Sequence, residues 1–282
     1  MTDWLTTPAS AYFLAWEQRY LDAAVADVFG FHALQLGLPE LDALRCNRMP
    51  HQWLAVDSAA APSTAASVEN AAVSRGGRVA ALACDFDVLP FDSQSLDLVV
   101  LPHALEFARD PHLTLREVER VLMPEGRVVI IGFNSTSLWG MRQQTAHARL
   151  RLGMSASMLL PVGSELIAYR RLRDWLRLLS FEVETGRFGC YRPPVKSAAW
   201  LARFGWMENA GDRWWPVFGA VYALTAVKRV RGMRLVGLVR EQRVTAAAAP
   251  AVVTNQQHRL PLNLLRTADA LRHLHRELAD HE

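Results

Sequence analysis

The stretch CDFDVLPFDSQSLDLVVL, residues 84–101, decides how the chain folds. One apolar run ends at Cys84 and Asp85, a polar turn follows, and a second apolar run, LDLVVL, begins at Leu96. Short apolar runs between turn signals are typical of strands that are covered on both faces of a parallel sheet. Because ligands bind outside the carboxyl ends of such strands, we expect Asp85 to lie at a ligand-binding edge.

Strands and helices alternate on the N-terminal side of this stretch. Apolar residues at helical spacing predict a helix over residues 8–28. A short strand is expected through Leu36, with a turn at Gly37 that leads into a second helix. Residues 52–57, QWLAVD, are expected to form another strand, and the Ala- and Ser-rich residues 58–77 a weakly patterned helix before the strand RVAALACD.

The same alternation continues on the C-terminal side. Asp110 and Pro111 supply an N-cap and a first-turn proline for a crossover helix over residues 111–122. The run RVVIIGF then reads as a buried fifth strand, followed later by a helix over residues 166–179 and the strand FEVETGRF. The segment WWPVFGAVYALTAVKRV resembles a closing hairpin strand. The pattern predicts one doubly wound α/β domain.

Two segments do not fit this alternation. Residues 135–164 show no clear period but are apolar and basic, and we interpret them as a cap insertion. Beyond Arg240 the low-complexity stretch VTAAAAPAVVTNQQ reads as a linker before a short amphipathic tail. The expected organisation is a domain over residues 1–240, with the cap insertion inside it, and a linker and tail over residues 241–282.

Composition excludes several classes of protein. Hydrophobic residues make up 51% of the 282 residues and charged residues 21%, which suits one sizeable core rather than a disordered chain. Three scattered cysteines suit a reducing cytoplasm and suggest neither a disulfide framework nor a metal centre. There is no signal-peptide pattern and no apolar run of membrane-spanning length. A net charge of +3 gives no argument for nucleic acid, and the oligomeric state stays open.

The central motifs carry a family resemblance. The pattern D-x-x-x-LPF, then S-L-D-L-V and LE, followed by LREVERVLMPEGRVVIIGF, resembles the central half of class I S-adenosylmethionine-dependent methyltransferases, the group that contains the quinone-biosynthesis methyltransferases. It covers Val79 to Phe133. The resemblance implies a Rossmann-like, doubly wound, mostly parallel seven-stranded sheet with a cap insertion after the fifth strand. It also implies S-adenosyl-L-methionine as cofactor and a small or lipid-like methyl acceptor.

Candidate cofactor-binding residues follow from spacing and from the resemblance. Asp57 lies 20 residues beyond Gly37 (57 − 37), the separation at which a Rossmann-type site places the carboxylate for the ribose hydroxyls. Asp85 and the backbone N–H of Phe86 match the family position that reads the adenine. The alternative is that each aspartate only forms a turn or caps a helix. Asp97 is interpreted as structural.

The glycine turn departs from the family pattern D-x-G-x-G-x-G. Here the corresponding residues are Gln35, Gly37, Pro39 and Leu41, so one glycine is kept and the acid is an amide. Proline fixes φ and has no N–H to donate, which removes part of the usual donor set around the cofactor. Alternatively, the turn takes another route and supplies donors from nearby residues.

Catalysis has one candidate residue. His103, just after LDLVVLP, matches the substrate-side edge of the family and could act as a base, although a packing role is the commoner one for such a histidine. The basic clusters could meet a polyanion, but solvated helix faces explain them equally well. Besides a methyltransferase, the chain could be a degenerate relative that serves as a ligand-binding or interaction module. A nicotinamide-dependent oxidoreductase fits least, because G-x-G-x-x-G is absent.

Overall fold

A computed structural model describes residues 2–58, 82–156, 159–161, 166–195 and 197–229. The chain divides into two units, Met1–Gly232 and Met233–Glu282, and all of the described residues belong to the first. The helix predicted over residues 58–77 and the linker and tail over residues 241–282 therefore lie outside the described residues, apart from Ser58.

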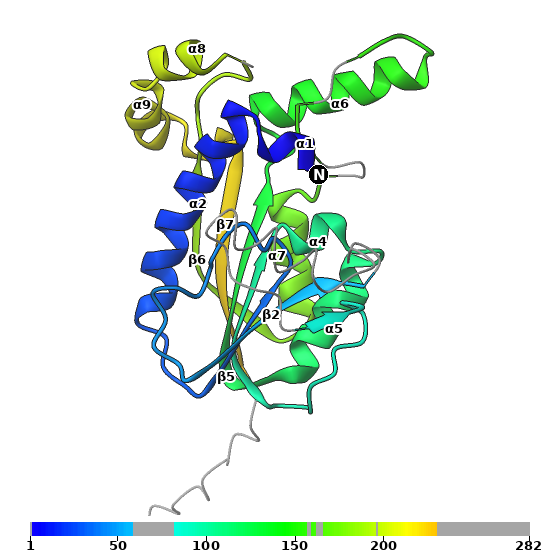
Figure 1. The fold of residues 1–282 in the computed structure, drawn as a ribbon, viewed down its shortest axis with the longest axis vertical. Coiled ribbons are helices and arrows are strands. Elements are labelled where there is room, and N and C mark those ends of the chain that lie inside the picture. The colour runs from blue at the N-terminus through cyan, green and yellow to red at the C-terminus, as the bar shows by residue number, and fades with distance from the viewer. Residues whose placement is uncertain (1, 59–81, 157–158, 162–165, 196, 230–282) are drawn as a thin grey trace, which may run out of the picture. The chain divides into compact units, whose positions relative to one another are not determined.

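The first unit is built on a single sheet in the order β3-β2-β1-β4-β5-β7-β6 (Figure 1). Its strands are β1 His32–Leu36, β2 His51–Asp57, β3 Leu82–Cys84, β4 Leu96–Pro102, β5 Leu122–Phe133, β6 Phe181–Gly189 and β7 Val221–Lys228. Strands β1 to β5 pair in parallel, whereas β7 is antiparallel to both of its neighbours. The predicted Rossmann-like, doubly wound, mostly parallel seven-stranded sheet is confirmed.

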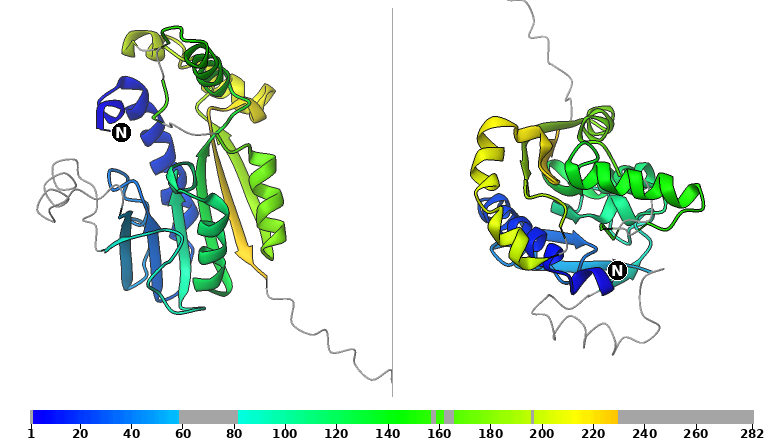
Figure 2. Two further views of the ribbon diagram at one scale, coloured as in Figure 1. Left: turned by 90° about the vertical axis from the view of Figure 1, so that its right-hand side faces the viewer. Right: turned by 90° about the horizontal axis from the view of Figure 1, so that it is seen from above.

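Helices cover both faces of the sheet (Figure 2). Helix α2 lies on one face, while α5 and α7 lie on the other. The helices of the described residues are α1 Thr2–Leu5, α2 Pro8–Ala26, α4 Ala104–Phe107, α5 Pro111–Val121, α6 Leu138–Arg151, α7 Tyr169–Leu178, α8 Ala198–Arg203 and α9 Met207–Trp214, with the 3₁₀ turn η1 Pro216–Phe218.

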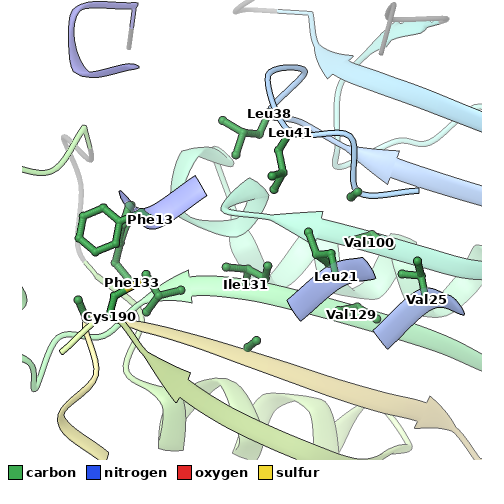
Figure 3. Close-up of a cluster of buried hydrophobic side chains, with 14 of the residues drawn as sticks. Phe13, Leu21, Val25, Leu38, Leu41, Val100, Val129, Ile131, Phe133 and Cys190 are labelled. Atoms are coloured by element: carbon green, nitrogen blue, oxygen red, sulfur yellow. The ribbon is translucent and has the colours of Figure 1, made fainter. Parts of the chain in front are cut away.

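Alternate residues of the central strands fill two separate cores. In β4, Leu98 and Val100 pack toward α2, whereas Val99 and Leu101 pack toward α5 and α7. Figure 3 shows the first cluster, where side chains of α2 meet those of β4 and β5. Because successive residues of a strand point to opposite faces, a strand buried on both sides must be apolar throughout. This is why residues 98–101, LVVL, form a continuous apolar run.

Several predicted elements are confirmed, with small shifts at their ends. Helix α5 begins after Asp110, whose carboxylate accepts from the backbone N–H groups of His112 (2.8 Å) and Leu113 (3.2 Å), as predicted. Helix α2 begins after Thr7, which caps it through Ser10, and it ends at Ala26. The predicted helix over residues 166–179 is α7.

Three expectations need correction. No helix follows Gly37: residues 37–50 form turns and irregular backbone, and the side chain of Gln35 holds residues 37–43 together. Residues 138–151 form the helix α6, capped by Ser137, although no period was evident. Its buried stripe is narrow and its outer face also carries apolar residues, which conceals the helical pattern. Finally, α8, α9 and η1 stand between β6 and β7, where no helix was predicted.

Candidate functional site

The carboxyl ends of β2 and β3 bring two predicted site residues together. Asp57 is the last residue of β2 and pairs in register with Cys84, the last residue of β3, so that Asp85 follows on the neighbouring strand. The Ser58 hydroxyl donates a hydrogen bond to the Asp85 carboxylate, and the Ser58 N–H donates to the Cys84 carbonyl (3.2 Å). We call this the acidic side of the site.

The pKa of the Cys84 thiol reflects the charges of both carboxylates. Burial and, after it, the nearby charges of Asp85 and Asp57 together raise the pKa of the Cys84 thiol to about 11. A thiolate is disfavoured there because it would add a negative charge between two others. The same arrangement favours a ligand that brings N–H or O–H donors to this edge.

Gly37 and Phe86 lie next to each other. Gly37 has a φ of +77°, which glycine adopts without strain, and its N–H donates to the Ala55 carbonyl at 2.7 Å. A Cβ on Gly37 would lie 3.8 Å from the Phe86 ring and 3.8 Å from the Cβ of Ala104. Phe86 is buried at this junction. The structure therefore brings together Gly37 and Phe86, the two predicted site residues that would contact a cofactor through their backbone and not through a charged side chain.

Gln35 organises the altered glycine turn. Its buried Nε2 donates to the carbonyls of Gly37 (3.1 Å), Leu38 (3.0 Å) and Leu41 (2.7 Å), and its Oε1 accepts from the Ala43 N–H at 3.0 Å. A carboxylate at this position could accept from Ala43 but could not donate to the three carbonyls. The amide is therefore matched to this turn, and the turn takes a route of its own.

The turn also directs side chains inward. Leu38 has a φ of 44°, an unfavourable conformation for a leucine, and its side chain is buried. Leu38 and Leu41 belong to the cluster that holds Phe13 and Leu21 of α2, and Figure 3 shows both leucines beside the turn. We call Gln35 and residues 37–43, together with the neighbouring His103, the turn side of the site.

His103 is held between two carboxylates. Its Nδ1 lies 2.8 Å from Glu106 Oε2 and its Nε2 lies 2.9 Å from Glu17 Oε1, while its ring stacks on Phe133 at 4.1 Å between centroids. Burial by itself lowers the pKa of His103, but the two carboxylates outweigh burial and raise it to about 10. The ring is therefore an imidazolium at neutral pH and donates from both nitrogens.

The two carboxylates connect three elements. Glu106 Oε1 accepts from the Phe133 N–H at the end of β5 (2.6 Å), and burial raises the pKa of Glu106. Glu17 comes from α2, and its Oε2 has no hydrogen-bond partner among the described residues. Sequence reasoning missed both glutamates. A signal was present for Glu17, because it lies four residues from Phe13 and from Leu21 on the buried stripe of α2.

Asp97 is structural, as its place in the sequence suggested. It lies at the opposite edge of the sheet, where its Oδ2 accepts from the N–H groups of Phe31 (2.8 Å) and His32 (2.9 Å). A Cβ on Gly30 would lie 2.4 Å from the Asp97 carboxyl carbon, so a glycine is needed for this approach. Asp97 fixes the entry into β1 and takes no part in the candidate site.

Within the residues that the structure describes, no group of His, Cys, Asp and Glu is arranged to hold a metal ion. In that same part of the chain, no helix has the length and apolar character needed to cross a membrane.

Comparisons with known proteins support one family. Residues 39–130 match the family described as methyltransferase domain. The chain is 32% identical over 168 residues to the uncharacterized protein YafS of Escherichia coli, a match that covers 59% of this chain and 59% of that protein. It is 34% identical over 58 residues to the ubiquinone/menaquinone biosynthesis C-methyltransferase UbiE of Cellvibrio japonicus, which covers 21% of this chain and 23% of that enzyme.

A solved structure supports the same conclusion for the fold. A chain from the complex between the Haloferax volcanii Trm112 methyltransferase activator and a methyltransferase superposes with a TM-score of 0.53 at 18% identity, covering 80% of this chain and 94% of that one. The family match over residues 39–130 and the strand order together support a class I methyltransferase-like domain in this chain.

Proposed function

We propose that the domain binds S-adenosyl-L-methionine at the acidic side and transfers its methyl group to a small or lipid-like acceptor. The observation that carries the proposal is the pair of carboxylates, Asp57 and Asp85, at the ends of neighbouring strands. This is the edge at which open parallel sheets bind their ligands. The family and fold imply the same cofactor.

The hydrogen-bond acceptors and the donor at this edge fit a nucleoside. Asp57 can accept from two ribose hydroxyls, and Asp85 can accept from the adenine amine. The N–H of Phe86 is the proposed donor to a ring nitrogen, and Gly37 allows close approach of the turn backbone. The cofactor supplies a methyl group on a sulfonium sulfur. The chain's task is then to position the acceptor and exclude water, which provides much of the rate when the acceptor is already nucleophilic.

His103 is better suited to positioning than to taking a proton. An imidazolium that donates from both nitrogens has no lone pair with which to act as a base. The ring joins α2, β4 and the end of β5 through Glu17, Glu106 and Phe133. We therefore propose that His103 fixes the wall of the site, and the base role suggested by its sequence position has no supporting contact.

A lipid-like acceptor is favoured by the apolar character of the segment after β5. Leu138 and Met141 of α6 expose their side chains close to the end of β5, within the proposed cap insertion. The named activity of UbiE, in ubiquinone and menaquinone biosynthesis, is consistent with a hydrophobic acceptor for this chain as well.

A second function is supported by the turn side. The Gln35 side chain bonds to the backbone of the turn, and the side chains of Leu38 and Leu41 are buried in the hydrophobic cluster beside it. These contacts favour the alternative in which the domain keeps the fold as a ligand-binding or interaction module without methyl transfer. One fold hosts many functions, so ligand binding decides between the two.

Calorimetric titration with S-adenosylmethionine tests the proposal. The parent should bind, and Asp57→Ala and Asp85→Ala should each weaken binding about tenfold or more, since a charge-assisted hydrogen bond contributes about 1.5–3 kcal/mol. Asp92→Ala, an exposed carboxylate in the turn before β4, serves as the matched control and should bind like the parent. Absence of binding at millimolar ligand would leave the module as the better account.

A further inference from the structure

Among the described residues, four tryptophans are exposed, and all four belong to one segment. Residues 197–218, which we call the Trp segment, contain α8, α9 and η1. Trp206 is 62% exposed and Trp214 is 73% exposed. The other large apolar side chains exposed there are Trp200, Trp215, Val217 and Phe218. Large aromatic side chains seldom face water in such numbers without a partner.

A second segment shows the same property without aromatic residues. Residues 136–156, which we call the α6 segment, expose the side chains of Leu138, Met141, Leu150, Leu152 and Met154. Leu152 is 77% exposed, directly beyond the end of the helix. The helix buries only its inner stripe, which includes Trp139 and Gln143.

Both segments leave the same edge of the sheet. The α6 segment follows Phe133 at the end of β5. The Trp segment connects β6 to β7, and Val221 at the start of β7 pairs with both Gly189 and Phe133. Figure 1 shows α6, α8 and α9 at one end of the sheet, and Figure 2 shows them from above. This is also the edge that holds the candidate cofactor site.

Hydrogen bonds hold the two segments in place. The indole N–H of Trp139 donates to the Arg192 carbonyl at 2.7 Å, which ties α6 to the connection before α8. The side-chain amide of Asn134 donates to the Gly219 carbonyl at 2.9 Å, and the Tyr191 hydroxyl donates to the Pro216 carbonyl at 2.9 Å. The exposed apolar side chains are therefore presented by an anchored scaffold.

The α6 segment is basic, whereas positive and negative charges balance on the Trp segment. Between Glu125 and Glu165 the sequence contains no acidic residue. Within that interval Arg142, Arg149 and Arg151 are exposed on α6. On the Trp segment, Arg203 and Arg213 are exposed, and the Arg203 guanidinium lies 5.6 Å from the Trp200 ring centroid. The segment also has two acids, Asp212 and Glu208, and Glu208 lies 3.4 Å from Arg192.

We propose that this surface binds an anionic membrane. Tryptophan prefers the boundary between lipid headgroups and hydrocarbon, and arginine beside it is attracted to anionic headgroups. A membrane would meet both segments at once, at the edge where a lipid-like acceptor would have to enter. The lipid acceptor belongs to the proposed function, but membrane binding itself requires neither cofactor nor methyl transfer.

Co-sedimentation with vesicles, without cofactor, tests this proposal separately from the proposed function. The full chain should bind phosphatidylcholine vesicles that contain phosphatidylglycerol at least tenfold more tightly than pure phosphatidylcholine vesicles, and added salt should weaken the binding. The double variants Trp206→Ser with Trp214→Ser, and Arg149→Glu with Arg151→Glu, should each weaken binding at least tenfold. All four side chains are exposed, so the thermal midpoint should stay close to that of the parent.

Matched controls lie at the opposite edge of the sheet. Phe29, before β1, is 76% exposed and Leu178, before β6, is 84% exposed. Phe29→Ser and Leu178→Ser should bind anionic vesicles like the parent. The proposal is overturned if the parent does not bind anionic vesicles, or if all variants bind equally. It is also overturned if size-exclusion chromatography shows the parent as a dimer and the tryptophan double variant as a monomer. The surface would then join two copies of the chain.

Discussion

The acidic side and the turn side occupy the same edge of the sheet but are built in opposite ways. On the acidic side, Asp85 is exposed and Asp57 partly so, and both can receive a ligand's donors. On the turn side, Gln35, Leu38, Leu41 and His103 are buried and bonded to the protein itself. We therefore propose that the acidic side would bind the nucleoside of the cofactor, and that protein side chains fill much of the space that would face its methionine end.

The largest expected effect concerns the buried histidine. His103→Ala would leave Glu17 and Glu106 buried without their shared cation, and removing one partner of a buried ion pair costs about 3–5 kcal/mol of unfolding free energy. Urea unfolding of the two proteins measures the difference. His51→Ala removes an exposed imidazole and should change stability by less than about 1 kcal/mol. Equal losses of unfolding free energy for the two substitutions would contradict a structural role for the turn side.

The pH dependence of stability should follow the same group. The folded pKa of His103 is raised from 6.5 to about 10, so the stability that this proton contributes is fully present below pH 6.5 and is lost as pH rises toward 10. The difference in unfolding free energy between the parent and His103→Gln should therefore shrink from pH 6 to pH 10. A constant difference would mean that the imidazole is neutral in the folded protein.

Gln35 tests whether the turn has been rebuilt around an amide. Gln35→Ala removes four hydrogen bonds and should cost about 2–4 kcal/mol, at a net 0.5–1.5 kcal/mol each with some relaxation. Gln35→Glu has nearly the same shape but places a buried carboxylate against three carbonyl oxygens. It should cost at least as much as the alanine. If the glutamate variant is as stable as the parent, the turn can accommodate the acid of the family pattern.

The fold could be predicted from sequence because its signals are local and strong. The apolar run LDLVVL, the Asp110 cap and the β-branched strand RVVIIGF each specify one element, and the parallel pairing follows from their alternation. Strand ends then placed Asp57 and Asp85 together. Whether these residues bind a cofactor stays a prediction.

The turn side could not be predicted because it depends on contacts between distant residues. In the sequence, Gln35 only marks the absence of the acid in the family pattern. Its role becomes visible in the structure, where its amide donates to carbonyls as far along the chain as that of Leu41. Glu17 and His103 are 86 residues apart, so no local pattern joins them. The Trp segment was missed for another reason: its helices are short and pack few residues into the core.

The most direct test of the account is the ratio of two affinities measured by calorimetry on the parent protein. If the acidic side carries the binding and the turn side contributes little, adenosine should bind less than about tenfold more weakly than S-adenosylhomocysteine, a loss below about 1.4 kcal/mol. Asp85→Ala should weaken both ligands by the same factor. A loss of a thousandfold or more on removing the homocysteine portion would contradict the account, because the turn side would then supply most of the binding free energy.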